Sequence, residues 1–555
     1  MDTGPSRLAF IPVLAAAVML GLAGPAHAQA ATADEITQHG ITITLDGDYR
    51  YGQFANGDYW LAPDEPDGRV TIVAMSPKFD GQHHGWQVNP DEFGPQGFDH
   101  RMRGGGFDAD LVPDLPYAAS PGESIVKTTS HDMGNSSPRP ALQSAVVLTI
   151  LAQAPEHDGT RHFRPPYFGH DKPMHHVDEL NLALLPSVAA PDTDVPSLAD
   201  AERRFERVWL DHRRGWTSRY IHPVDNMPHY GSGMMRTAGD VALRLMLDAP
   251  IEDRKQAAIN YLQWGIDLFA MYEAGLRWSG AGGHMHGRKL PMAMAAVLLD
   301  HEPMKQAVMQ REHPAYPDRY DADVWQEDSS VHYAVPARRV LWGQPRGGYW
   351  RRLAEGRGPR SSRDPEGYID GGDSPGGGYQ LCCTSMTWKG TALALHLMPE
   401  LREVWDYEPF LDYVDRWVHF GAWTLPDPFN RDGERDPDAG GRFPDAHNTR
   451  ADEGGWDSSF ANAMWSLHRV EEAAPMPHIE PYNATLTGSV TVELSSPHLE
   501  DATLRYTLDG SLPDENAPVY DGPIEVTEPT TLRVRAYRDG YLPSAANRAV
   551  FAAED

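Results

Sequence analysis

The chain has 555 residues, which is too many for one ordinary hydrophobic core, so we expect two or three domains. Its formal net charge is −31, and so acidic a surface disfavours nucleic acid and anionic membranes as partners. The only two cysteines, Cys382 and Cys383, are adjacent, and we interpret them as small buried residues rather than as a strained vicinal disulfide. The composition therefore predicts a large protein that is held together by its cores and not by a disulfide framework.

Residues 1–28 have the pattern of a signal peptide. Arg7 precedes an apolar run from Leu8 to Ala23, and the run is followed by the small-residue sequence Gly24-Pro25-Ala26-His27-Ala28. We predict cleavage before Gln29 and a secreted or periplasmic mature protein. The remainder of the sequence contains no second apolar stretch long enough to span a membrane, and nothing in it indicates an oligomeric state.

Residues 29–160 are expected to form a β-rich module. Apolar and polar residues alternate from Ile41 to Leu45, and Asn56-Gly57 is a strong hairpin signal. His83 and His84 have side chains that can bind a metal, but adjacent surface histidines seldom do so. We therefore predict no metal site and no cofactor, with a structural calcium or zinc ion left open.

Residues 161–474 change to a helical pattern. Apolar residues recur at helical spacing, for example at Ala258, Leu262, Ile266 and Phe269. Long loops rich in Gly, Pro and Asp separate the predicted helices, which cover Leu198–Arg213, Gly231–Leu247, Glu252–Glu273, Leu290–Gln310, Ser385–Met398, Phe410–Trp423 and Trp456–Val470. This arrangement favours a catalytic α/α barrel (toroid), with a superhelical bundle as the alternative.

A glycine-rich joint between two of these helices holds the first set of candidate site residues. It contains histidines, whose protons move near neutral pH, and cationic and aromatic side chains that can hold a substrate. We assign proton transfer to His284 or His286. The residues assigned to substrate binding are Arg277, Trp278, Arg288 and Lys289, and Pro291 is well placed in the first turn of the next helix.

An arginine-rich segment follows at positions 338–363. It contains eight arginines and a single acid, Glu355, in a chain that is otherwise strongly acidic. Because a guanidinium group binds carboxylate or sulfate through two parallel hydrogen bonds, this segment is suited to an anionic polymer. We place Arg338 in the catalytic set and Arg339 in the substrate-binding set.

Residues 479–555 read as a separate module of short strands. Tyr506-Thr507-Leu508-Asp509-Gly510-Ser511-Leu512-Pro513 is followed by Tyr520-Asp521-Gly522-Pro523-Ile524, the strand Val534–Tyr537 and Gly540-Tyr541. This pattern resembles the C-terminal β-sandwich of chitobiases and hexosaminidases, and similar modules accompany family 29 fucosidases. The resemblance implies an immunoglobulin-like accessory domain in a carbohydrate-related protein, without identifying the catalytic reaction.

Two reactions on carbohydrate could use such a set of residues. A lyase that cleaves a uronate polymer by β-elimination must neutralise the carboxylate, remove the C5 proton and protonate O4. Asn226, a histidine of the joint, Tyr333 and Arg338 supply the required chemical types. An inverting glycosidase instead needs two carboxylates that flank a water molecule, and the spacing does not select a pair from Asp225, Glu327, Asp328, Asp370 and Asp373.

The order Asn226, His284, Tyr333, then Arg338 and Arg339 is similar to that of toroidal alginate and glucuronan lyases, most like family 38 of the polysaccharide lyases. In that family the arginine and the tyrosine follow in a different order, so Tyr349 or Tyr379 is an alternative acid, and Tyr379 is also a candidate for substrate binding. The resemblance implies β-elimination on an anionic, uronate-containing polysaccharide. The alternatives are an inverting glycoside hydrolase and a non-catalytic glycan-binding protein.

Overall fold

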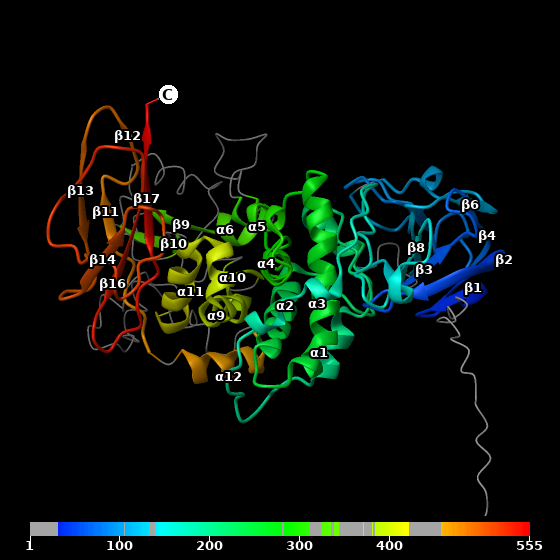
Figure 1. The fold of residues 1–555 in the computed structure, drawn as a ribbon, viewed down its shortest axis with the longest axis horizontal. Coiled ribbons are helices and arrows are strands. Elements are labelled where there is room, and N and C mark those ends of the chain that lie inside the picture. Colours follow the sequence, from blue (N-terminus) through cyan, green and yellow to red (C-terminus); the bar gives the residue numbers. More distant parts are fainter. Residues whose placement is uncertain are drawn as a thin grey trace, which may run out of the picture.

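The computed structural model describes residues 31–104, 106–132, 139–279, 282–310, 324–334, 338–342, 370, 380, 383–420, 457–469 and 471–554. Within these residues the protein has three parts in a row: a β-rich part at one end, helices in the middle and a second β-rich part at the other end (Figure 1). The predicted signal peptide, residues 1–28, lies outside the described residues, so export stays a prediction. None of the helices that the structure describes combines the length and the apolar character needed to cross a membrane.

An eight-stranded sheet forms the N-terminal part, as the alternating pattern predicted. Its spatial order is β5-β7-β8-β3-β2-β4-β6, and β1 pairs with β2. The strands are β1 (Thr32–Gln38), β2 (Ile41–Gln53), β3 (Tyr59–Ala62), β4 (Val70–Ser76), β5 (Trp86–Val88), β6 (Tyr117–Ala119), β7 (Ser124–Ser130) and β8 (Leu142–Ile150). The predicted hairpin at Asn56-Gly57 joins β2 to its antiparallel neighbour β3.

Strand β8 connects this sheet to the helices because its two faces enter two different cores. Val146 and Leu148 pack in the core of the sheet itself, whereas Ala145 and Val147 pack in the large core shared with the helices. The buried guanidinium group of Arg164 strengthens the junction: its Nε lies 2.6 Å from Asp58 Oδ2 and its Nη2 lies 2.6 Å from Asp267 Oδ2.

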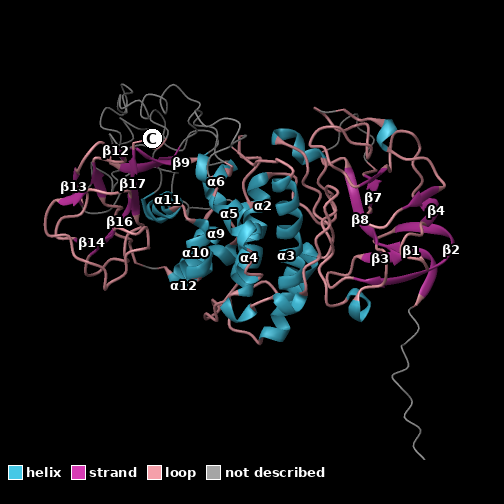
Figure 2. Cartoon of the chain, turned by 45° about the horizontal axis from the view of Figure 1, so that its top comes forward, coloured by secondary structure: helices cyan, strands magenta, loops and turns pink. Residues whose placement is uncertain are grey.

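The middle part consists of packed helices (Figure 2). The described helices are α1 (Leu198–Phe205), α2 (Gly231–Leu245), α3 (Ile251–Glu273), α4 (Lys289–Leu298), α5 (Glu302–Met309), α6 (Gln326–Ser329), α9 (Lys389–Leu397), α10 (Pro399–Trp405), α11 (Glu408–Phe420) and α12 (Ser459–His468). The predicted apolar face of α3 is buried along its whole length. Gly265 lets α3 approach α4 closely, since a Cβ there would lie 2.8 Å from the Cβ of Ala295. A closed α/α toroid is not confirmed by these helices.

A short hairpin, which the sequence did not predict, stands between the helices and the C-terminal part. Strand β9 (Val331–Ala334) pairs antiparallel with β10 (Arg339–Trp342). The start of the arginine-rich segment therefore lies on and beside a strand, whereas Arg346, Arg351, Arg352, Arg357, Arg360 and Arg363 lie outside the described residues.

The C-terminal part is the expected β-sandwich. One sheet has the order β11-β13-β15 and the other the order β12-β17-β16-β14. The strands are β11 (His478–Glu480), β12 (Ala484–Leu486), β13 (Val490–Ser495), β14 (Thr503–Thr507), β15 (Ile524–Val526), β16 (Thr530–Tyr537) and β17 (Asn547–Ala553). Alternate residues of the two sheets, such as Val492 and Val534, fill a core of their own. On the helical side, Glu408 Oε2 accepts a hydrogen bond of 2.7 Å from the Ala546 amide.

Candidate active site

The glycine-rich joint lies between the N-terminus of α2 and Cys383. A Cβ on Gly283 (φ +84°) would lie 2.5 Å from the carbonyl oxygen of Cys383, and one on Gly287 (φ +95°) would lie 2.6 Å from the Met235 amide nitrogen. Both positions therefore require glycine for its positive φ and for the close approach of the neighbouring backbone. Cys383 is disulfide-bonded, so our interpretation of the cysteines as two unlinked buried residues was wrong.

Helix α6 holds the joint from one side through three consecutive side chains. Gln326 Oε1 accepts a hydrogen bond of 2.8 Å from the Met285 amide, and Glu327 Oε1 accepts one of 2.6 Å from the Gly287 amide. Asp328 Oδ2 lies 2.7 Å from Lys289 Nζ. These residues occur in the polar segment that follows Trp325, but their spacing alone does not reveal which backbone they hold.

Arg288 holds the same joint from the inside. Its side chain is fully buried, and its Nε and Nη2 lie 2.7 and 2.8 Å from the two carboxylate oxygens of Asp211. Its Nη1 donates hydrogen bonds of 2.6 and 3.1 Å to the carbonyl oxygens of His284 and His286. Because all three nitrogens are directed to buried acceptors, we assign Arg288 to loop architecture and not to substrate binding.

Both ring nitrogens of His286 are also hydrogen-bonded inside the protein. Trp388 Nε1 donates to its Nδ1 at 3.0 Å, and its Nε2 lies 2.9 Å from the carbonyl oxygen of Cys383. Since an indole nitrogen only donates, Nδ1 is the acceptor and Nε2 carries the proton. Burial, together with the charge of Arg288, lowers the pKa of His286 to about 3. The ring has no nitrogen left for a substrate, so of the two predicted histidines His284 stays the candidate base.

His284 combines a buried position with an uncommitted ring nitrogen. Its Nδ1 has no hydrogen-bond partner, and 8% of the residue is exposed. The Tyr230 ring packs edge-on against it with the centroids 4.5 Å apart, while the Tyr230 hydroxyl donates to the carbonyl oxygen of Gly282 at 2.6 Å. Burial, followed by the charge of Arg288 and the neighbouring His222, lowers the pKa of His284 to about 4. The ring is therefore neutral at pH 7 and able to accept a proton.

Two further arginines act on His284 and Tyr230. The guanidinium group of Arg219 lies 5.7 Å from the centre of the Tyr230 ring, and Arg139 acts electrostatically on both His284 and His229. After burial, the groups that lower the pKa of His284 most are two arginines and two histidines, although the protein as a whole is acidic. An anionic substrate is the kind of ligand that such a neighbourhood attracts.

Asn226 lies in the loop before α2, and its side-chain amide is hydrogen-bonded to the backbone. Its Nδ2 donates hydrogen bonds of 3.1 and 3.0 Å to the carbonyl oxygens of Arg207 and Val208. Neutralising a carboxylate would require these same amide hydrogens. We therefore assign Asn226 to holding its loop, and Arg219 and Arg139 become the candidates for charge neutralisation.

Tyr333 and the two arginines that follow it contact different neighbours from those of His284. The Tyr333 hydroxyl lies 2.7 Å from His478 Nδ1, its ring packs against Tyr482 of the C-terminal part, and burial raises its pKa. Arg338 is exposed, and with Arg339 it lines a cavity of about 40 Å³ between α11 and the C-terminal part. The structure places these three predicted residues at the junction with the C-terminal part, and the contacts given above for Tyr333, Arg338 and Arg339 do not include His284.

The remaining predicted binding residues are mostly internal. Arg277 donates to the carbonyl oxygens of Tyr272 and Leu276 and lies over the Tyr272 ring. Trp278 is fully buried and stacks on Trp325. Lys289 is fully buried against Asp328, as described above. Tyr379 and the alternative acid Tyr349 lie outside the described residues.

Most of the carboxylates named for a glycosidase are neutralised by cations. Asp225 pairs with Arg207, Asp328 with Lys289 and Asp370 with Arg416, while Asp373 lies outside the described residues. Glu327 differs, because its Oε2 is buried without a hydrogen-bond partner and burial raises its pKa to about 7. The sequence named Glu327 as one of five candidate carboxylates but did not place it in the catalytic set. The signal for it was its position in an acidic segment flanked by aromatic residues.

Comparison with known proteins identifies one part of the chain. A family model described as the chitobiase/β-hexosaminidase C-terminal domain matches residues 481–547, which include strands β12 to β16 of the sandwich. No curated protein and no solved structure matches the chain. The match confirms the predicted resemblance of the C-terminal module and points to a carbohydrate-active enzyme. It does not distinguish a lyase from a hydrolase, and it gives no support to polysaccharide lyase family 38.

Gly231→Ala should disturb the joint from the α2 side. A Cβ at Gly231 would lie 2.7 Å from the His284 carbonyl carbon, so the backbone that carries the candidate base must move. We expect a loss of about 1–3 kcal/mol in stability, measured by urea unfolding, together with reduced turnover. Gly47→Ala is the matched control, because a Cβ at Gly47 meets nothing within 4 Å. Equal stability of the two variants would contradict this packing.

His284 should titrate far below an ordinary histidine. With a pKa of about 4 in the folded protein and 6.5 as its usual value, the unfolded chain binds the extra proton between these two pH values. The contribution of His284 to stability is therefore complete above pH 6.5 and falls as the pH drops toward 4. Nitrogen NMR shifts of labelled histidines, assigned with His284→Asn, should show a neutral ring at pH 6. A midpoint near 6.5 would contradict the buried setting.

Proposed function

We propose that the protein cleaves a uronate-containing anionic polysaccharide by β-elimination, with His284 as the general base. The observation that carries the proposal is the neutral His284 ring, with its uncommitted Nδ1, packed against the phenol of Tyr230 among cationic groups. The C-terminal module of chitobiase/β-hexosaminidase type supports a carbohydrate substrate. The proposal includes an α/α toroid as the fold of the helical domain and an exported mature chain.

The reaction assigns one task to each group. A nitrogen of His284 takes the proton from C5 of the uronate, and the C5–H electron pair forms the C4–C5 double bond. The bond between C4 and O4 breaks. The Tyr230 hydroxyl, which donates to the carbonyl oxygen of Gly282 in the unbound protein, turns to the departing O4 and gives it its proton. Arg219 and Arg139 neutralise the uronate carboxylate, which makes the C5 proton more acidic. Solvent then restores both protonation states.

The ion pairs favour this reaction over hydrolysis by two carboxylates. Asp225, Asp328 and Asp370 each have a cationic partner, which leaves Glu327 as the described candidate with a carboxyl oxygen that has no partner. An inverting glycosidase needs a second carboxylate across the bond, and such a residue would have to come from outside the described residues.

Incubation with alginate, glucuronan and related polymers tests the proposal. β-Elimination creates an unsaturated uronate, so ultraviolet absorbance should rise in step with the number of new chain ends. New reducing ends without that absorbance would establish the glycosidase instead. If neither signal develops, and immobilised polysaccharide still retains the protein, a non-catalytic glycan-binding function replaces the enzyme.

A further inference from the structure

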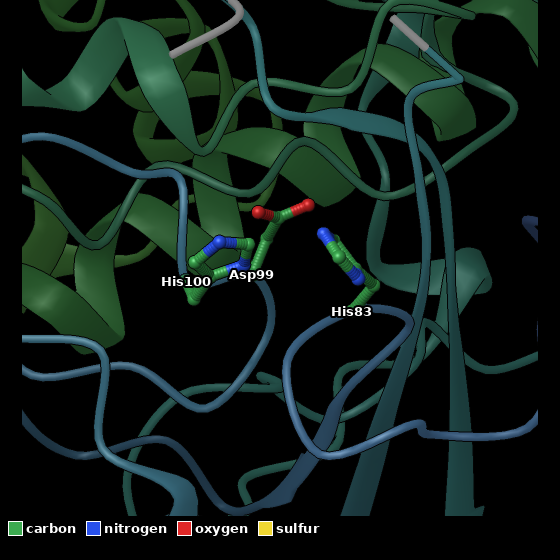
Figure 3. A group of neighbouring side chains, drawn as sticks. All are labelled: His83, Asp99 and His100. Atoms are coloured by element: carbon green, nitrogen blue, oxygen red, sulfur yellow. The ribbon is translucent and has the colours of Figure 1, made fainter. Parts of the chain in front are cut away.

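A second cluster of chemically active side chains lies in two loops of the N-terminal part. It comprises His83, in the loop between β4 and β5, and Asp99 and His100, in the loop after β5. One ligand atom from each of the three residues lies within 4.8 Å of the others. Figure 3 shows the Asp99 carboxylate between the two imidazole rings, with a ring nitrogen of His83 directed toward it.

The backbone holds the two loops together at this cluster. The His100 amide donates to the carbonyl oxygen of Gln82 at 2.9 Å, and the Gly85 amide donates to that of Phe98 at 2.9 Å. The rings of His83 and His100 approach edge to face with centroids 4.7 Å apart. The side chains are therefore brought together by a fixed loop pair and not by a chance contact between mobile surface groups.

Asp80 orients the ring of His83. Its Oδ2 lies 3.0 Å from His83 Nδ1, and its Oδ1 accepts hydrogen bonds of 2.9 and 2.7 Å from the amides of Gln82 and His83. A carboxylate on one imidazole nitrogen fixes the tautomer and leaves the other nitrogen as an acceptor. His83 Nε2 is thereby prepared to bind a cation.

Asp99 and His100 complete the set in different ways. The Asp99 carboxylate is fully buried and accepts hydrogen bonds of 3.0 and 2.8 Å from Nε and Nη2 of Arg101, which fix its orientation. Asp99 Oδ1 also accepts a hydrogen bond of 2.8 Å from the Arg101 amide, so Oδ2 is the oxygen that has a second lone pair for a cation. His100 is exposed, so a coordination position on this side is open to solvent.

We propose that His83, Asp99 and His100 bind one divalent transition-metal cation of the Zn²⁺ type. Two imidazole nitrogens and one carboxylate oxygen suit Zn²⁺, and three protein ligands leave a fourth tetrahedral position for water. The ion links the two loops. His84, which the sequence placed beside His83 as a metal candidate, is not among the three residues whose ligand atoms cluster here, and its Nδ1 accepts a hydrogen bond of 3.1 Å from the Ser130 amide.

Zn²⁺ titration of the full chain, without a histidine tag and against a chromophoric chelator, tests the site. We expect one equivalent of Zn²⁺ to bind and to raise the thermal midpoint. His83→Ala and His100→Ala should each weaken binding at least about tenfold, and Asp80→Asn should weaken it about 10–100-fold by removing the orienting carboxylate. His170→Ala is the matched control, since His170 is an exposed histidine paired with Asp91, and it should bind Zn²⁺ as the parent does.

Two further measurements establish whether each variant is folded and how the metal is coordinated. Far-ultraviolet circular dichroism of the metal-free variants separates loss of binding from loss of folding. Co²⁺ in place of Zn²⁺ should give the strong visible absorption of a four-coordinate ion, and this absorption should disappear in His100→Ala. Absence of stoichiometric Zn²⁺ binding, unchanged binding by the folded His83→Ala and His100→Ala variants, or equally tight binding of Ca²⁺ would each overturn the proposal.

Discussion

His284→Ala should abolish measurable turnover on the polysaccharide while leaving the protein folded. Loss of a positioned general base typically costs about 10²–10⁴-fold in rate. His284 contributes its ring to one edge-on contact with Tyr230, and its Nδ1 makes no hydrogen bond whose loss would destabilise the protein. The measurement is kcat from ultraviolet absorbance, paired with the urea unfolding midpoint.

Two companion variants make this result interpretable. Tyr230→Phe keeps the ring against His284 and removes the hydroxyl, so it should lower kcat with little change in KM if the phenol protonates O4. His286→Ala should lower stability and activity together, because both nitrogens of His286 are hydrogen-bonded in the interior. Full activity of a folded His284→Ala protein would remove His284 from the reaction, and parent-like stability of His286→Ala would contradict its structural role.

The sequence was informative where the fold depends on residues that are near one another in the chain. The alternation at Ile41–Leu45 predicted a strand that is buried on one side, and the helical spacing from Ala258 to Phe269 predicted the buried face of α3. The C-terminal pattern predicted the module that the family match confirms. Each of these signals is carried by side chains within a few residues of one another.

The roles of the polar residues depend on partners far away in the sequence. His286 meets Trp388 across 102 positions, and Arg288 meets Asp211 across 77. Before these partners are known, the sequence cannot distinguish a histidine with both ring nitrogens hydrogen-bonded in the core from one with a ring nitrogen that has no partner. For this reason the joint at 282–289 could be selected from the sequence, whereas the choice between His284 and His286 required the structure.

Arg288→Met should be the most destabilising of the substitutions considered. It leaves the Asp211 carboxylate buried without its principal counter-charge, and removing one partner of a buried pair typically costs about 3–5 kcal/mol. The carbonyl oxygens of His284 and His286 lose their donor in the same step, so the candidate base should also lose its position. We expect a lower urea midpoint and little activity.

A double variant and a surface control separate this effect from the loss of one positive charge. Asp211→Asn combined with Arg288→Met removes the uncompensated carboxylate and should cost less than the sum of the two single changes. Arg203→Met removes an exposed arginine that pairs with Asp200 and should change stability by at most about 1 kcal/mol. If Arg288→Met instead kept the parent midpoint and raised only KM, Arg288 would be a substrate-binding residue, as the sequence first suggested. Because its guanidinium group is fully buried and directed to Asp211 and two carbonyl oxygens, we expect the midpoint to fall.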